Sequence, residues 1–166
     1  SEDRVKGNRN FLNKLWNANN FFIQNKCMFK KDSKVSKHKI NINKWIFSEL
    51  LKTKNIVEKN IKNYRFDEAA RNIYQFVWHY YCDWYLELSK TILYSNDKFA
   101  IKEVREVSGF IFKEILVLMH PFIPFVTEEI WLKNKLDNSG KSYLMYSNWI
   151  KGKIKKDNDH KEVEKV

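Results

Sequence analysis

The sequence predicts an all-α fold, an antiparallel bundle of about five helices, and three observations lead to this prediction. Apolar residues recur at helical spacing in four long segments. The 166 residues include only four glycines and two prolines, too few for the turns of many short strands. Hydrophobic residues make up 43% of the chain and aromatic residues 16%, enough for one compact core. We expect residues 1–150 to form this bundle and residues 151–166 to form a charged tail or linker.

The first predicted helix covers about residues 3–28. On a helical wheel at about 100° per residue, one side is an apolar stripe formed by Phe11, Leu15, Ala18 and Phe22. The opposite side is a polar arc formed by Arg9, Asn10, Asn13, Lys14, Asn17 and Asn20. Phe21 lies within about 20° of Lys14, because residues seven apart nearly superimpose on a helix. An aromatic side chain is therefore predicted on a hydrogen-bonding surface.

A basic loop is predicted at residues 30–42, after the first helix and before the second. Asn43 is the expected N-cap of a helix that ends near residues 63–64, with an inner stripe of Ile46, Leu50, Val57 and Ile61. The third helix begins near Phe66, and α-helical spacing predicts an inner stripe of Phe66, Ala70, Ile73, Val77, Tyr81, Trp84 and Leu88. The fourth follows the capping pair Asn96–Asp97, with an inner face of Ala100, Val104, Val107, Ile111, Ile115 and Leu118.

The motif "HPFIPF" ends the fourth helix, because proline cannot continue its hydrogen-bond ladder. His120 is accordingly expected at the helix end. Pro124 suits the first turn of a short fifth helix, which carries "VTEEIW" and fades by Leu136. Residues 137–141 are a predicted turn, and "SYLMYSNWI" is expected to lie back on the bundle as a short extended segment.

A search for catalytic residues finds no suitable constellation. The histidines are never three or four residues apart, as metal ligands on a helix would be; they are His38, His79, His120 and His160. Cys27 and Cys82 have no metal-type spacing and are expected to be free thiols. The adjacent Glu128 and Glu129 point about 100° apart, which favours a role at the helix N-terminus over paired acid and base catalysis. No catalytic residue, metal site or cofactor-binding site is predicted in this chain.

Asp83 and Glu87, four residues apart on one helix face, have two interpretations. They could contact a cation or a ribose, or they could pair with an Arg or Lys of the protein. The second interpretation is favoured.

The formal net charge of +11 indicates a polyanionic partner. The richness of the chain in Lys, Asn and Ile offers a second explanation, codon bias, so charge alone does not establish nucleic-acid binding. The same choice applies to the lysines of the 30–42 loop, which either touch an RNA backbone or are simply solvated, with the second favoured. There is no run of about 18 apolar residues and no apolar signal core in "SEDRVKGNRN", so we expect a cytoplasmic protein without a membrane span.

The polar arc of the first helix has the side chains that single-stranded RNA requires. Proteins stack splayed bases on aromatic rings and read base edges with amide and ammonium groups. The arc offers Phe21 for stacking, Arg9 for a phosphate, and several hydrogen-bonding side chains, namely Lys14, Asn10, Asn13 and Asn17. The alternative is that Phe21 packs under the 30–42 loop or against another helix.

Three separated segments stand out, namely "GNRNFLNKLWNANNF" (7–21), "YRFDEAARNIYQFVWHYYCDWYLELSK" (64–90) and "LMHPFIPFVTEEIW" (118–131). Together these three segments resemble the anticodon-binding domain of class I aminoacyl-tRNA synthetases. The last is shared by the valyl, isoleucyl and leucyl families, whereas "NKLWNA" together with "CDWYLELSK" is more similar to the valyl family. The resemblance spans nearly the whole chain and implies a helical bundle that grips the anticodon stem-loop of a tRNA.

Matched by position, the resemblance implies that Phe21 stacks on an anticodon base and that Lys14 contacts a base or its phosphate. Arg9, Asn13 and Asn17 are further candidates on the same arc. The implied partners are a valine tRNA and the remaining domains of a synthetase, with a monomer expected and no membrane. The family's catalytic signatures "HIGH" and "KMSKS" do not occur in this sequence. ATP with Mg would therefore act in the parent enzyme, and this fragment is expected to be non-catalytic.

Two alternatives remain open. One is the same domain from an isoleucyl or leucyl enzyme, which would read a different anticodon through the same kinds of contact. The other is a helical interaction scaffold with non-specific RNA affinity. Base-dependent affinity separates a reader of anticodons from a scaffold, because a wrong base costs a reader roughly 1–3 kcal/mol.

Overall fold

The computed structural model describes residues 2–27, 39–136 and 142–149, and within them every regular element is a helix. The first two helices are α1 (Glu2–Gln24) and α2 (Asn41–Lys62). A continuous rod then runs through α3 (Phe66–Gln75), the π-helix η2 (Phe76–Leu86) and α4 (Glu87–Leu93). The remaining elements are α5 (Lys98–Met119), α6 (Pro124–Lys133) and a 3-10 turn, η3 (Leu144–Tyr146). The all-α prediction is confirmed, with the third predicted helix corresponding to the rod.

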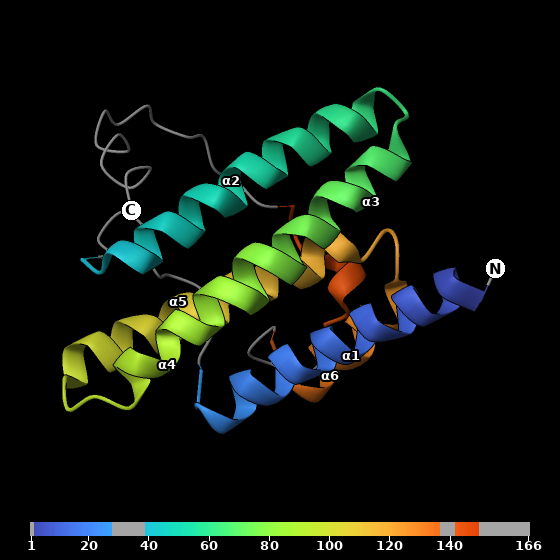
Figure 1. The fold of residues 1–166 in the computed structure, drawn as a ribbon. Helices are drawn as coiled ribbons and strands as arrows, with labels where there is room; N and C mark the ends of the chain where they lie inside the picture. Colours follow the sequence, from blue (N-terminus) through green and yellow to red (C-terminus); the bar gives the residue numbers. More distant parts are fainter. Residues whose placement is uncertain (1, 28–38, 137–141, 150–166) are drawn as a thin grey trace.

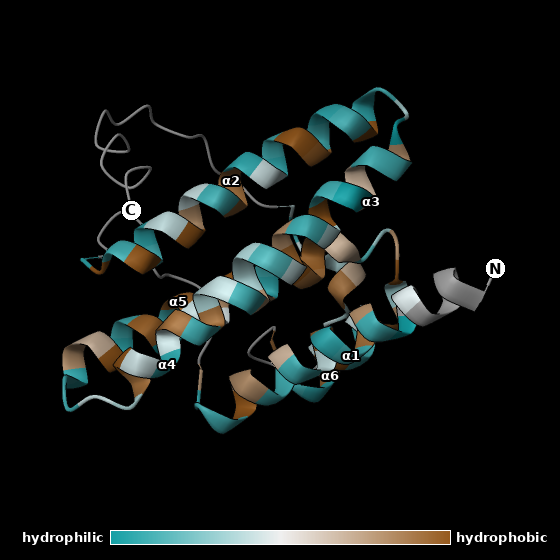
Figure 2. Ribbon diagram, in the orientation of Figure 1, coloured by the Kyte–Doolittle hydropathy of each residue, from teal (hydrophilic) through white to brown (hydrophobic). Residues whose placement is uncertain are grey.

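The rod lies at the centre of the bundle (Figure 1). Helix α2 packs along α3 and η2 in the opposite direction, α1 contacts η2 and α5, and α5 also contacts α2, α3, α4 and α6. Apolar side chains from all the long helices form one core, which includes the fully buried Leu15, Leu50, Tyr81, Ile111 and Ile130. The visible sides of α1 and α3 carry mainly hydrophilic residues (Figure 2), as expected for helices buried on one side only.

The π-helix changes which side chains of the rod face the core. A π-helix bonds i to i+5 instead of i+4, so each turn holds more residues than α-helical spacing assumes. Tyr81 is buried as predicted, but Trp84 is 60% exposed and Leu88 is 42% exposed, whereas Tyr85 is fully buried. The predicted inner stripe is therefore wrong beyond Tyr81. It is also wrong at Phe66, which is 52% exposed where the rod begins.

Asn43 is not the N-cap of α2, as the sequence predicted. The capping position is Ile40, which has extended backbone angles and no side-chain cap. The carboxylate of Glu103, from α5, accepts hydrogen bonds from the backbone N–H groups of Lys39 and Ile40 at 3.0–3.2 Å and from Nδ2 of Asn43 at 3.0 Å. A carboxylate at the positive end of α2 is electrostatically favourable. The cap is therefore supplied by another helix, and Asn43 is a buried link inside α2.

The second half of the chain follows its sequence signals closely. Asp97 caps α5, and its side chain accepts hydrogen bonds from two backbone N–H groups of the first turn, both at 3.0 Å. His120 is the C-cap of α5, and Pro124 lies in the first turn of α6. Glu128 accepts a hydrogen bond from the backbone N–H of Leu144 at 2.8 Å. It thereby attaches the 142–149 segment to the bundle, a role that the sequence did not indicate.

Three helices end on left-handed residues that are not glycine. Lys26, Tyr64 and Lys135, which follow α1, α2 and α6, have φ angles of 52°, 58° and 51°. After α2, the N–H of Tyr64 donates to the carbonyl of Ile61 and that of Arg65 to the carbonyl of Asn60, the pattern of a Schellman motif. This chain thus terminates helices despite its scarcity of glycine.

Several predictions fall outside the described residues, namely most of the basic loop 30–42, the turn at 137–141 and the tail 151–166. Within the described residues, no helix is both long and apolar enough to cross a bilayer.

Candidate nucleic-acid interface

The structure places most of the predicted polar arc of α1 on the surface. Arg9, Asn10, Asn13, Asn17 and Asn20 are all exposed. Amide side chains with one donor and one acceptor group suit the edges of unpaired bases, and the guanidinium of Arg9 suits a phosphate. The arc is therefore available to a ligand, and its amides are not used to fill the core.

Phe21 is only partly exposed and packs against the edge of the hydrophobic core. The next residue, Phe22, is buried, and its ring lies 5.5 Å from the ring of Phe112 on α5. The α1 backbone at Phe21 is also fixed, since its carbonyl accepts hydrogen bonds from the backbone and side-chain nitrogens of Asn25 at 3.0 and 2.9 Å. Phe21 therefore packs against the core and, as a residue of intermediate exposure, still reaches the surface.

Lys14 does not extend freely into solvent but crosses to η2. Its Nζ donates a hydrogen bond to a carboxylate oxygen of Asp83 in an ion pair. The same ammonium lies 3.9 Å from the centroid of the Trp78 ring, within the range of a cation–π interaction. Only 22% of the Lys14 side chain is exposed, compared with 41% for Asp83. Lys14, for which a base or phosphate contact is predicted, thus links α1 to η2 through its ion pair.

The other Asp83 carboxylate oxygen lies 3.3 Å from Nδ1 of His79, which is four residues earlier on the same rod. Asp83 is therefore flanked by two basic side chains, one from α1 and one from η2. Glu87, its neighbour on the predicted acidic face, instead accepts from Nζ of Lys90 at 2.7 Å. The favoured interpretation, in which these carboxylates pair with basic residues of the protein, is confirmed for both.

A row of aromatic rings runs from Trp78 on the rod to α1. The Trp78 ring stacks on Tyr74 with centroids 5.4 Å apart and an interplanar angle of 18°. Tyr74 in turn contacts Phe11 of α1, with centroids 4.8 Å apart. The i, i+4 spacing of Tyr74 and Trp78 was visible in the sequence, but their contact with α1 was not, because it joins segments more than sixty residues apart.

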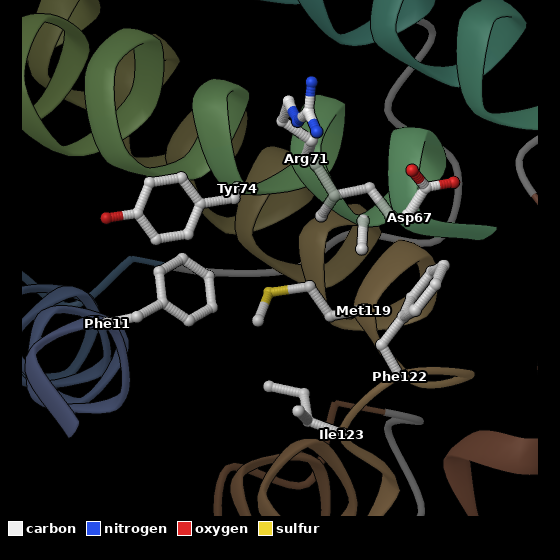
Figure 3. A pocket seen from close by; sticks show the side chains of 9 residues that line it. Phe11, Asp67, Arg71, Tyr74, Met119, Phe122 and Ile123 are labelled. Carbon is white, nitrogen blue, oxygen red and sulfur yellow. The ribbon is translucent and has the colours of Figure 1, made fainter. Parts of the chain in front are cut away.

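A groove of about 690 Å³ continues from the end of this row (Figure 3). Phe11 and Tyr74 form one side, and Met119, Phe122 and Ile123 from the α5–α6 corner form much of the rest. Charge enters the lining only through Asp67 and Arg71 on α3. The groove is mostly apolar and extends the aromatic part of this surface, not its charged part.

The two cysteine thiols are buried and are not activated as nucleophiles. Both cysteines are free and buried, and desolvation raises the pKa of Cys27 to about 11 and that of Cys82 to about 12. Thiols with such pKa values are protonated at neutral pH and are poor nucleophiles. Within the described residues, no three His, Cys, Asp or Glu side chains are grouped as metal ligands. The His120 Nδ1 atom lies 2.9 Å from the hydroxyl of Thr127, a contact that joins α5 to α6.

Comparison with known families identifies the helical bundle. Residues 43–166 match the family described as the anticodon-binding domain of tRNA ligase. The chain belongs to this family. The matched region contains the rod with Trp78 and Asp83, but α1 with Lys14 and Phe21 precedes it.

Individual relatives are valine–tRNA ligases, and one of them extends the similarity over α1. The chain is 65% identical to a valine–tRNA ligase of Pelagibacter ubique over all 166 residues, which is 19% of that protein's length. It is 46% identical over 128 residues, 77% of the chain, to a valine–tRNA ligase of Bradyrhizobium diazoefficiens. A valine–tRNA ligase of Caulobacter vibrioides is 45% identical over 133 residues, or 80% of the chain. The chain spans less than a fifth of the length of each of these relatives.

Proposed function

We propose that this chain recognises the anticodon stem-loop of a valine tRNA as one domain of a valine–tRNA ligase. The observation that carries the proposal is the 65% identity to such an enzyme along the whole chain, α1 included. In the proposed parent enzyme, other domains use ATP with Mg to attach valine to the tRNA, and this domain contributes binding only. The enzyme is proposed to act in the cytoplasm as a monomer.

The surface between α1 and η2 supports this assignment because it offers each kind of contact that a single-stranded loop needs. Arg9 is an exposed cation for a phosphate, and the asparagines of the polar arc supply donors and acceptors for base edges. Phe21 is partly exposed and packs against the core, so stacking on it would cost little further ordering of the side chain. Lys14, on the same helix and paired with Asp83, provides a further donor.

The test is fluorescence anisotropy of the purified chain with a labelled valine anticodon stem-loop, at low and moderate salt. A stem-loop with the second and third anticodon bases changed serves as the specificity control. We expect the valine loop to bind more tightly by roughly 1–3 kcal/mol per recognised base. Equal binding that disappears with salt would favour the non-specific scaffold. Preference for an isoleucine or leucine loop would reassign the domain within the subgroup.

Phe21→Ala measures the stacking contribution, with Phe66→Ala as the matched control. Phe66 is a half-exposed phenylalanine at the start of α3, away from the polar arc. Phe21→Ala should weaken binding to the valine loop by roughly 1–3 kcal/mol, the usual worth of one stacked base. Phe66→Ala should leave binding unchanged. Equal losses in the two variants would exclude a stacking role for Phe21.

A further inference from the structure

The outer face of α2 is a basic surface on another helix than the polar arc of α1. Helix α2 contains five lysines and two glutamates, the largest excess of basic over acidic residues among the helices of the described residues. The neighbouring rod contains four acidic residues and, besides His79, only two basic ones. Positive charge is therefore concentrated on α2, whereas a bias of composition alone would spread it over the bundle.

The exposed lysines of α2 share one side of the helix. At about 100° per residue they fall within an arc of about 80°, opposite the buried Leu50 and Val57. At about 1.5 Å per residue, they extend over about 27 Å of helix. These four residues form what we call the α2 strip, namely Lys44, Lys52, Lys59 and Lys62.

The two glutamates of α2 leave most of this charge in place. Glu49 pairs with Lys52 at 2.8 Å, and Glu58 pairs with the buried Lys54 at 3.2 Å. Among the described residues, no ion pair is seen for the other three members of the α2 strip. Their ammonium groups are therefore available to an anionic ligand.

The stability of α2 does not account for the whole strip. Lys59 and Lys62 lie in the last turn, where positive charges interact favourably with the helix dipole. Lys44 lies near the start of α2, where a positive charge is unfavourable, and the first turn contains no acidic residue. A lysine that opposes the helix dipole favours a role in binding over a role in folding.

We propose that the α2 strip binds the phosphate backbone of double-stranded RNA, as a second surface that acts independently of the polar arc. The inference goes beyond the proposed function, because it requires no recognised base. The two surfaces belong to helices on either side of the rod (Figure 1). Helix α2 packs along α3 and η2, whereas α1 contacts η2 and α5.

The chemistry of the strip suits a phosphate backbone. Lysine contacts phosphate as a point charge and by such contacts carries no sequence information. Ser48 and Asn55 lie within the same arc and can donate to phosphate oxygens or to ribose hydroxyls. An RNA helix places a phosphate at every nucleotide along its length, so it can follow a strip of about 27 Å. An acidic protein would need carboxylates placed at the same spacing.

The experiment measures binding of a blunt RNA duplex without a loop, by anisotropy over a range of salt concentrations. The strip variant combines Lys44→Gln, Lys59→Gln and Lys62→Gln. The control variant combines substitutions of three exposed lysines outside α2, Lys98→Gln, Lys133→Gln and Lys135→Gln. Both variants lose three positive charges, so they differ only in where the charge is removed. Circular dichroism checks that each variant is folded.

For the strip variant, we expect the slope of log Kd against log salt to fall by about 0.7–0.9 for each lost phosphate contact, or by about 2 in total. The control variant should keep the wild-type slope. Replacing the same three strip lysines by arginine should also keep it, because the charge remains. If the strip variant does not fold, the three single substitutions decide, each with about a third of the shift.

Three results would overturn the inference. The wild-type chain could fail to bind the duplex, or the strip and control variants could lose equal slope, which would show that only net charge matters. In the third, poly-glutamate of equal charge displaces the duplex as well as unlabelled duplex does, and the strip would then be assigned to an acidic protein partner. Failure of the proposed function is a separate result, because it concerns the preference of the wild-type chain between two stem-loops.

Discussion

The rod carries two polar clusters that differ in how completely their hydrogen bonds are satisfied. In the buried network, Tyr85 donates to Oδ1 of Asn43 at 2.8 Å, and Nδ2 of Asn43 donates to Glu103 at 3.0 Å. All three residues are buried. In the Lys14–Asp83 site, the side chains are between one-fifth and two-fifths exposed. Both clusters join the rod to a neighbouring helix, but only the second leaves polar atoms within reach of a ligand.

This difference separates a structural polar cluster from a binding surface. Burying polar groups is tolerable only when partners replace the lost water, and the buried network achieves this with groups from α2, η2 and α5. A half-exposed ion pair contributes little to stability, because water screens it. Changes in the buried network should therefore affect folding, and changes in the Lys14–Asp83 site should affect binding.

The largest expected effect is on Tyr85, which lies on the buried side of η2. Tyr85→Ala removes a fully buried ring and should lower the free energy of unfolding by roughly 3–5 kcal/mol. Trp84→Ala is the matched control, because Trp84 is the adjacent aromatic residue and is 60% exposed. It should change stability by about 0.5 kcal/mol or less. Urea unfolding followed by circular dichroism measures both. A larger stability loss for Trp84→Ala than for Tyr85→Ala would mean that η2 is wound as an α-helix.

Removing Glu103 tests whether the N-terminus of α2 depends on a cap from α5. Glu103→Ala leaves the N–H groups of Lys39 and Ile40 and the amide of Asn43 without their acceptor. We expect a loss of about 3 kcal/mol, because hydrogen bonds to charged groups are worth about 1.5–3 kcal/mol each. Hydrogen exchange should show fraying in the first turn of α2. A loss below about 1 kcal/mol would mean that water replaces the cap.

Glu114 carries a buried carboxyl group that has fewer hydrogen-bond partners than that of Glu103. Its contribution to the free energy of unfolding should depend on pH. One of its oxygens has no hydrogen-bond partner, and burial raises its pKa from 4.5 to about 7 despite the nearby Lys113 and Lys54. Between pH 4.5 and about pH 7, the Glu114 carboxyl is deprotonated in the unfolded chain but still protonated in the folded protein. Rising pH therefore destabilises the folded state by up to about 3 kcal/mol. Glu114→Gln should remove this dependence.

The check is a pair of denaturation series from about pH 4 to about pH 8. Relative to wild type, Glu114→Gln should become more stable as pH rises through this window and show no trend below pH 4.5, the usual pKa of the group. A constant difference between the two proteins at all pH values would show that the Glu114 carboxyl ionises normally.

The smallest expected effect on folding is at Lys14. Lys14→Gln breaks the ion pair with Asp83, but the pair is partly exposed and such pairs contribute about 0–1 kcal/mol. The melting temperature should therefore change by only a few degrees, while the preference for the valine stem-loop is lost. A destabilisation as large as that of Tyr85→Ala would remove the distinction between the two clusters.

Local signals predicted much of the fold because they depend on neighbouring residues. Asp97 caps α5, Pro124 begins α6 and the apolar spacing of α5 matches its buried face, since each follows from the geometry of one helix. The prediction for Asn43 was wrong because the cap of α2 comes from Glu103, sixty residues away. The prediction for Trp84 was wrong because η2 has π-helical spacing, which the pattern of apolar residues did not indicate.

The sequence by itself determined the helices, their order and a polar arc on α1 with an aromatic residue in it. Periodicity and capping are properties of single segments, so they can be read without knowing what the segments pack against. Only the tertiary structure decided that Phe21 is partly packed against the core and that Lys14 meets Asp83 and Trp78. These contacts depend on the placement of α1 against the rod, and that placement is set by the packing of the whole core.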